Sequence, residues 1–257
     1  MKKILVPSLI ACAVSALAPV VHAQTAPAAA ASSLSFNAGV VSDYRYRGIS
    51  QSRLEPALQA GVDYADKSGF YVGAWGSSIK WIKDATATDG SVEIDLYGGY
   101  KGAIGNVAYD VGYLRYEYVG NKLGNVAIEG VPLYGTANTN EIYGAVTLGA
   151  YTAKYSYALS NLFGNLNSKG SYYLDLSATY DLGGGYSLVP HVGYQKVANT
   201  PDGTYTDYAL TLGKDLGNGL SATGAIMGTN AKKSFYYTPQ NKATGDTGLV
   251  VGLKYTF

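Results

Sequence analysis

Charged side chains in this sequence occur within segments where apolar residues occupy every second position. Val92, Ile94 and Leu96 fall on one face of an extended strand. Glu93 and Asp95 fall on the opposite face. The charged residues and the histidine that we assign to such polar faces are Asp63, Glu93, Asp95, Asp110, Arg115, Glu141, Lys154, Asp175, His191, Asp207 and Lys254. Carboxylates predominate among them, so a pore lined by these faces would favour cations. Alternatively, these groups pair across strands and fill the interior without leaving a pore.

A second set of charged residues lies close together near the beginning of the chain. Arg45 and Arg47 flank Tyr46 with a period of two, so their guanidinium groups share a face. Guanidinium groups pair bidentately with carboxylates or phosphates. These residues therefore predict either a structural salt-bridge cluster with Asp43 or a site for phosphate groups.

His191 is the candidate for acid–base chemistry, because it is the histidine that follows the N-terminal targeting segment described below. Ser187 lies on the same predicted strand face, about 13 Å away at the usual rise of a strand. A nucleophile and its base need a separation of about 3 Å, so Ser187 is too far away, although a serine on another strand could reach the histidine. The sequence has no metal-ligand cluster, phosphate loop or dinucleotide fingerprint. We expect no enzyme, no cofactor and no metal.

The composition narrows the class of protein. The chain has 257 residues and a formal net charge of +1, without the basic stripe of a nucleic-acid-binding protein. Mean hydropathy is +0.00, and no apolar run after the N-terminal segment is long enough for a membrane helix. Tyrosine is abundant, with 25 residues against 5 phenylalanines. Its amphipathic ring prefers the boundary between a membrane and water, so the composition suits a membrane protein built from strands.

The N-terminus reads as a secretory signal peptide over residues 1–23. A positively charged start is followed by an apolar stretch and by small residues before Gln24. An alternative is lipidation at Cys12, because the residues before it resemble a lipoprotein cleavage box. Residues 24–33 are rich in alanine and read as a flexible leader before a single domain over residues 34–257.

The rest of the chain divides into about twelve alternating segments, each near the ~9–11 residues that a tilted transmembrane strand needs. We expect strands near 34–44, 55–66, 69–80, 91–102, 105–118, 139–150, 151–160, 171–182, 185–196, 204–215, 218–229 and 246–257. Tight turns rich in glycine and asparagine alternate with longer polar links along the whole chain. This alternation predicts an all-β fold, a transmembrane antiparallel up-and-down β-barrel with short periplasmic turns and long outer loops.

The last segment predicts the seam of that barrel. Leu249, Val251, Leu253, Tyr255 and Phe257 share one strand face. The last strand of a closed barrel must pair with its first, and aromatic side chains suit the lipid boundary. The pattern that ends in Tyr255 and Phe257 also resembles the signal read by the outer-membrane barrel assembly machinery.

Several motifs carry a resemblance to a known family. They are Ser42-Asp43-Tyr44-Arg45-Tyr46-Arg47-Gly48-Ile49-Ser50-Gln51, Gly69-Phe70-Tyr71-Val72-Gly73, Glu93-Ile94-Asp95-Leu96-Tyr97-Gly98-Gly99-Tyr100 and Tyr109-Asp110-Val111-Gly112-Tyr113. Together they resemble the TorF-like porin family of proteobacterial outer membranes. The resemblance implies an exported barrel in the bacterial outer membrane.

The sequence thus predicts a porin-like channel for passive diffusion of small solutes or ions, with a preference for cations. The expected partners are outer-membrane lipid, lipopolysaccharide at the rim cluster of Asp43, Arg45 and Arg47, the assembly machinery and the diffusing solutes, but no nucleic acid. Two alternatives stay open: a non-conducting structural or adhesive barrel that works through its outer loops, such as 230–245, and an outer-membrane hydrolase.

Overall fold

The structure is a computed structural model that describes residues 32–84 and 89–257. The predicted signal peptide, Cys12 and most of the predicted leader lie outside the described residues. Within the described ranges, no helix is long and apolar enough to cross a membrane.

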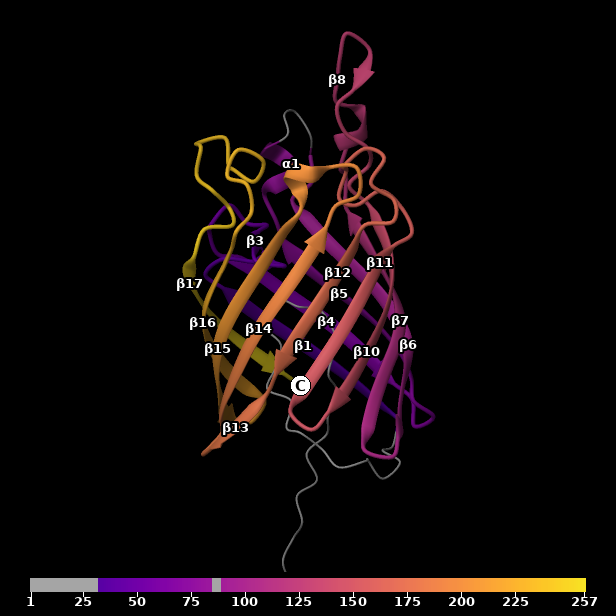
Figure 1. Ribbon diagram of the computed structural model, residues 1–257. Helices are drawn as coiled ribbons and strands as arrows, with labels where there is room; N and C mark the ends of the chain where they lie inside the picture. The colour runs from indigo at the N-terminus through magenta and orange to yellow at the C-terminus, as the bar shows by residue number, and fades with distance from the viewer. Residues whose placement is uncertain (1–31, 85–88) are drawn as a thin grey trace, which may run out of the picture.

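Twelve antiparallel crossings form one closed sheet, which confirms the predicted barrel (Figure 1). Each strand pairs with the next along the chain, and one crossing is split in two by Thr179. The strands are β1 (Ser33–Val41), β4 (Ala57–Ala65), β5 (Phe70–Ser78), β6 (Val92–Ile104), β7 (Val107–Tyr118), β10 (Thr139–Leu148), β11 (Tyr151–Ala158), β12 (Tyr172–Ala178) with β13 (Tyr180–Gly183), β14 (Tyr186–Lys196), β15 (Tyr205–Gly217), β16 (Leu220–Thr229) and β17 (Gly248–Thr256). All twelve predicted segments therefore correspond to crossings of the wall.

The seam between β17 and β1 closes the barrel. The two strands pair in register from Asn37 opposite Thr256 to Val41 opposite Gly252. Beyond them, Phe36 and Phe257 exchange two backbone hydrogen bonds of 2.8 and 2.9 Å, and their rings stack at 5.8 Å between centroids. Among the described residues, closure leaves no unpaired edge in the wall, as the hydrocarbon layer of a membrane requires.

The connections divide by length between the two ends of the barrel (Figure 1). Tight turns join the strands at the lower end, where Asn218 and Gly219 have φ values of 52° and 82° as a two-residue hairpin turn demands. In the turn after β4, the Ser68 hydroxyl and backbone N–H donate to Asp66 and, with Ser32, lower the pKa of that carboxyl to about 2. The upper end carries the long loops, which contain α1 (Trp81–Asp84), η1 (Leu123–Asn125), β8 (Ala127–Ile128), β9 (Val131–Pro132) and η2 (Pro201–Gly203).

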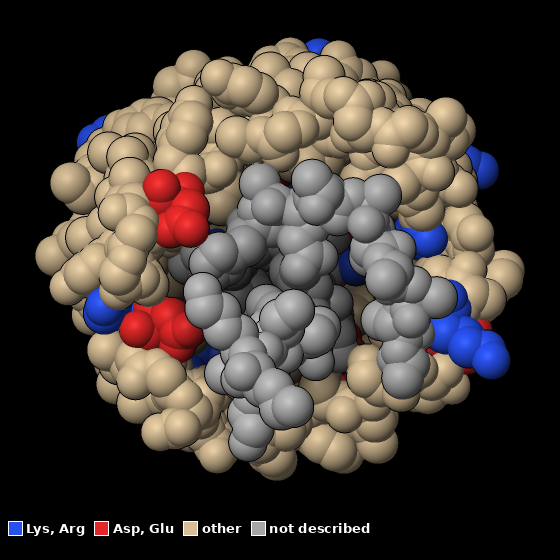
Figure 2. Space-filling view, turned by 90° about the horizontal axis from the view of Figure 1, so that it is seen from below, with Lys and Arg blue, Asp and Glu red and all other residues tan. Residues whose placement is uncertain are grey.

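The outer wall is apolar. Leu58, Ile104 and Leu249 are 70%, 77% and 68% exposed, and each stands on the face opposite the inward side chains of its strand or turn. Seen from below, most of the visible surface is uncharged (Figure 2). A belt of this kind suits contact with lipid, because strands that cross a membrane alternate apolar-out and polar-in.

A charge placed on this belt is expected to destabilise the barrel. Leu176 lies midway along the β12–β13 crossing and faces outward. We expect Leu176→Arg to cost about 2–4 kcal/mol, because arginine at the midplane loses its hydration. Urea unfolding of the protein in lipid vesicles measures this cost.

The matched control for that substitution is Leu216→Arg, because Leu216 faces outward at the turn end of β15. An arginine near the interface should cost only about 0–1 kcal/mol. Equal costs for the two variants would contradict the assignment of this face to lipid.

One of the predicted outer loops turns into the barrel instead of extending away from it. Residues 42–56, which we call the inner segment, turn into the barrel between β1 and β4. They form a small hairpin of β2 (Arg45–Tyr46) and β3 (Ile49–Ser50). Tyr44 is 1% exposed and Arg47 is 4% exposed, so the segment packs against the inner wall.

Candidate functional site in the barrel lumen

The tip of the inner segment is a two-residue turn that places Arg47 inside the barrel. Arg47 and Gly48 have φ values of 48° and 78°, the pair of positive angles that a two-residue hairpin turn needs. A Cβ on Gly48 would lie 2.5 Å from the Thr229 side chain and 2.8 Å from that of Asp207, so only glycine fits against the wall. The local sequence Arg-Gly therefore fixes the position of the guanidinium group.

Arg47 links the inner segment to two strands of the wall. Its Nη2 donates to Glu141 Oε2 at 2.7 Å, and its Nη1 donates to Glu141 Oε1 at 3.1 Å and to Gln195 Oε1 at 2.6 Å. The guanidinium carbon lies 4.4 Å from the centre of the Tyr173 ring and 4.8 Å from that of Tyr46. Bidentate pairing and ring contacts of this kind are a strength of arginine that lysine lacks.

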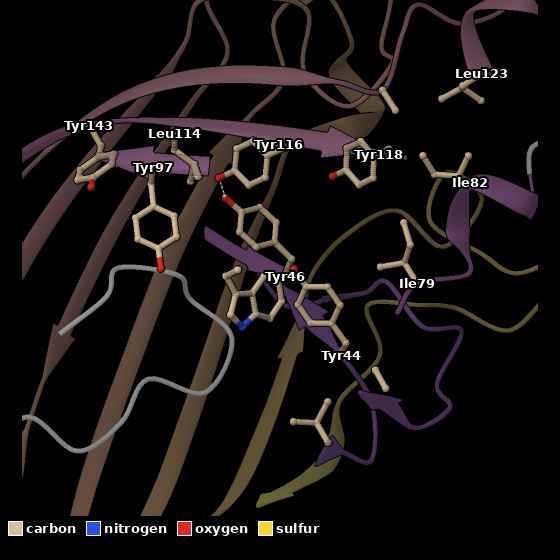
Figure 3. Packing of buried hydrophobic residues seen from close by; sticks show 14 residues of the cluster. Tyr44, Tyr46, Ile79, Ile82, Tyr97, Leu114, Tyr116, Tyr118, Leu123 and Tyr143 are labelled. Atoms are coloured by element: carbon tan, nitrogen blue, oxygen red, sulfur yellow. Dashed lines mark hydrogen bonds between the residues drawn. The ribbon is translucent and has the colours of Figure 1, made fainter. Parts of the chain in front are cut away.

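Aromatic side chains also fix the inner segment to the inner face of the wall (Figure 3). The hydroxyl of Tyr46 meets the hydroxyl of Tyr116 on β7, and Tyr116 in turn donates to Glu141 Oε2 at 3.1 Å. The Tyr44 ring packs edge-on against Trp75 with 5.4 Å between centroids, and its hydroxyl donates to Glu93 at 2.9 Å. The segment is thus joined to β5, β6, β7, β10 and β14 by side chains.

The predicted rim residues separate into two places. Arg45 Nε donates to Asp43 Oδ2 at 2.6 Å, and the Ser50 hydroxyl donates to Asp43 Oδ1 at 2.5 Å. Arg45 also donates to the backbone carbonyl of Asp246 at 2.7 Å. Arg47 does not join this cluster, because the turn directs it to Glu141. All three predicted residues are buried, so a rim site for lipopolysaccharide phosphates finds no support in this geometry.

A second cluster surrounds His191. Its Nε2 lies 3.2 Å from Asp175 Oδ2 and its Nδ1 lies 3.5 Å from Asp207 Oδ1. The Tyr173 hydroxyl is 3.1 Å from both carboxylate oxygens of Asp207 and 3.2 Å from His191 Nε2. A cavity of about 160 Å³ opens beside these groups, between the inner segment and the wall. Three strands, β12, β14 and β15, therefore bring the three predicted residues together.

The other predicted lumen residues lie on the inner wall in separate contacts. The Tyr97 hydroxyl donates to Asp63 at 2.5 Å, and the Tyr71 hydroxyl donates to Asp110 at 2.6 Å. The Lys154 ammonium lies 4.2 Å from the centre of the Tyr143 ring. Lys254 faces inward on β17 between outward-facing Leu253 and Tyr255.

The prediction for Arg115 is wrong. Leu114 and Tyr116 are buried in the lumen, so Arg115 between them must point outward. It pairs with Glu117 near the loop end of β7, and its Nη1 donates to Asn140 at 3.1 Å. Arg115 comes five residues after inward-facing Asp110. Side chains alternate along a strand, so an odd offset places the two residues on opposite faces.

Two carboxyl groups are buried in the lumen with unsatisfied oxygens. Glu93 and Asp95 are 1% and 0% exposed. Within residues 32–84 and 89–257, neither oxygen of Asp95 nor Oε2 of Glu93 has a hydrogen-bond partner. Ionised carboxylate oxygens buried without a partner are costly, so these two groups do not count as fixed negative charge of the lumen.

Sequence reasoning missed most of the inward tyrosines. The abundant tyrosine was attributed to the lipid boundary, yet several rings turn inward and donate to carboxylates. Tyr97 is among them and was expected on the polar face with Glu93 and Asp95, whereas Tyr44, Tyr71, Tyr116 and Tyr173 were not expected in the lumen. The alternation of side chains was the available signal, since Tyr173 shares its strand face with Asp175.

The arrangement around His191 does not form a nucleophile–base pair with Ser187. Ser187 is fully buried, and its hydroxyl has no hydrogen-bond partner among the described residues. Ser177 lies opposite His191 in the strand register, but both ring nitrogens of His191 already face carboxylates. A base that activates serine needs one nitrogen free for the hydroxyl.

A closed barrel with an apolar outside and a charged inside defines the porin type of fold, and comparison with solved structures agrees. The chain is similar to the KdgM porin, with a TM-score of 0.53 at 9% identity over 88% of this chain and 99% of that one. It is similar to the same porin in complex with disordered oligogalacturonate, with a TM-score of 0.51 at 9% identity and the same coverage of both chains. The COG4313 outer membrane channel from Pseudomonas putida F1 has a TM-score of 0.46 with this chain. The two are 12% identical, and the match covers 92% of this chain and 98% of that one.

The chain belongs to a family of bacterial proteins of unknown function (Gcw_chp), whose profile matches residues 25–257. No curated protein matches the sequence. The narrower resemblance to TorF-like porins stays a prediction.

Proposed function

We propose that this protein is a channel of the bacterial outer membrane through which small solutes or ions diffuse passively, with a preference for cations. The observation that carries the proposal is the charge of the inner surface within a wall that is apolar outside. The inward carboxylates that have partners among the described residues are Asp43, Asp63, Asp110, Glu141, Asp175 and Asp207, against Arg45, Arg47, Lys101, Lys154 and Lys254. Glu93 and Asp95 add to the carboxylates wherever they are ionised. The excess of carboxylates favours cations by electrostatic attraction.

The inner segment would set the width of this channel. A barrel of about twelve strands has a modest bore, between small barrels filled by side chains and wide porins. Here residues 42–56 occupy part of that bore and contact opposite stretches of the wall through Arg45 and Arg47. We therefore expect small conductance steps.

The similarity to KdgM supports the channel but not its solute. The KdgM complex contains oligogalacturonate, which is anionic. The excess of carboxylates in this lumen would repel such a polyanion, so we propose a different class of solute for this chain. If the TorF-like resemblance holds, the proposal applies to that group of porins as well.

The proposal predicts discrete conductance steps when the purified protein is inserted in a planar bilayer. Under a salt gradient, the reversal potential should have the sign of a cation-preferring pore, because the lumen carries excess negative charge. A reversal potential of the opposite sign would contradict the cation preference. A bilayer that holds folded protein but shows no steps would contradict the channel itself and favour a non-conducting barrel.

The proposed location implies two further partners. Outer-membrane lipid and lipopolysaccharide would contact the wall and the loops, and the barrel assembly machinery would read the strand that ends in Phe257. An outer-membrane hydrolase is the weaker candidate, because the carboxylates around His191 occupy both ring nitrogens. A lipid-release assay of the wild type and His191→Ala tests it, and equal low release in both is the result we expect.

A further inference from the structure

The cavity beside His191 has the size of a small organic ligand. Its volume is about 160 Å³, close to engineered cavities of about 150 Å³ that bind benzene. A ligand of about six non-hydrogen atoms fills such a space. The cavity lies between the inner segment and the wall, in the path that the proposed channel would use.

One side of the cavity is negative. Asp175 and Asp207 flank His191, so two carboxylates face one imidazole. The two guanidinium groups at the edge of the cavity do not balance them, because Arg45 is paired with Asp43 and Arg47 with Glu141. With a neutral imidazole the two carboxylates leave the cavity net negative, although Lys154, directly opposite Asp175 in the strand register, offsets part of that charge.

The cavity also has apolar lining. It is formed by Val41, Val189, Ala209, Met227 and Val250. A hydrated inorganic ion prefers a shell of oxygen ligands on all sides. Moreover, the described residues contain no group of three or more His, Cys, Asp or Glu side chains arranged to hold a metal ion. A cation with an apolar body matches both the charged and the apolar lining of this cavity.

A further polar group in the lining lacks a partner. Gln59 lines the cavity, and its amide nitrogen is buried without a hydrogen-bond partner within the described parts of the chain. An unsatisfied buried amide costs free energy, so a ligand or water in the cavity gains by meeting it. The amide nitrogen is a donor, so it indicates a water or another acceptor in the cavity beside the ammonium ion, which itself can only donate.

We infer that this cavity is a binding subsite for a small organic ammonium ion, held by Asp175 and Asp207 with its apolar body against the apolar side chains of the lining. The inference rests on the proposed channel function for its role, since the subsite would lie in the permeation path. It identifies the class of cation that the channel would favour.

Binding of n-butylammonium chloride tests the inference without requiring conduction. Saturation-transfer NMR on the folded protein in detergent micelles should show saturable binding to the wild type. Binding should weaken at least about tenfold in Asp175→Asn/Asp207→Asn, since one factor of ten corresponds to about 1.4 kcal/mol of lost charge interaction. Asp110→Asn is the matched control, because it removes a lumen carboxylate outside the cavity and should leave binding unchanged.

A neutral molecule of the same size separates charge recognition from filling of an apolar space. 1-Butanol should bind far more weakly than n-butylammonium, and equal binding would overturn the assignment of an ammonium site. Equal n-butylammonium binding by wild type and the double variant would also overturn it. If the double variant does not fold, as judged by heat-modifiability on gels, the single Asp175→Asn variant serves in its place.

Conductance measured on the same preparations distinguishes the two proposals. Discrete conductance steps without n-butylammonium binding would overturn the subsite and leave the channel standing. Binding without steps would overturn the channel but leave the site assignment supported. Block of the sodium current by millimolar n-butylammonium, lost in the double variant, would support both.

Discussion

Replacing Arg47 by glutamine is expected to release the inner segment and to raise the single-channel conductance several-fold. The substitution leaves Glu141, which is 1% exposed, without its counter-charge. Breaking one partner of a buried ion pair typically costs about 3–5 kcal/mol. The segment can avoid much of this cost by moving out toward water, which widens the bore. Planar-bilayer recording of the wild type and Arg47→Gln measures the change.

Two comparisons separate this effect from a general loss of stability. In the double variant Arg47→Gln/Glu141→Gln no charge is left unpaired, so its conductance should return toward the wild-type value. Glu55→Gln breaks an exposed ion pair with Lys80, which should matter little. A conductance that stays at the wild-type level in Arg47→Gln would show that the ion pair does not hold the segment in place.

The wall of the barrel could be predicted from the sequence because its physical cause is local. A period of two in apolar residues decides which side chains face lipid, and Asn218-Gly219 decides where a hairpin turns. The same local reasoning placed Glu93 and Asp95 in the lumen. It failed for Arg115 because that residue was assigned to the lumen for its charge. Its neighbours Leu114 and Tyr116 face the lumen, so alternation directs Arg115 outward.

The path of residues 42–56 could not be predicted, because it depends on partners far away in the sequence. Arg47 meets Glu141 and Gln195, and no local pattern distinguishes a loop that turns inward from one that extends into water. The Arg47-Gly48 pair was a usable signal for a tight turn. The strands that this turn contacts can be identified only once the closed barrel is known.

Replacing residues 42–56 by a four-residue turn is expected to give the largest change in conductance. Val41 on β1 pairs directly with Ala57 on β4, so a short hairpin connection can join them without changing the register. The wall should remain folded, because, of the removed residues, only Ser42, which bonds Val251 at the end of the seam, takes part in the hydrogen bonds between the described wall strands. Conductance should exceed that of Arg47→Gln, since the whole segment leaves the lumen.

The same variant makes a prediction about ion preference whose sign follows from the charges removed. The deletion takes away Arg45, Arg47 and Arg53 but only two carboxylates, Asp43 and Glu55. The lumen that remains is more negative, so the reversal potential in a salt gradient should shift further toward cations. Liposome swelling with neutral sugars of increasing size measures the bore independently of charge. If larger sugars enter no faster than in the wild type, the narrowest point lies elsewhere in the barrel, and the inner segment has a structural role alone.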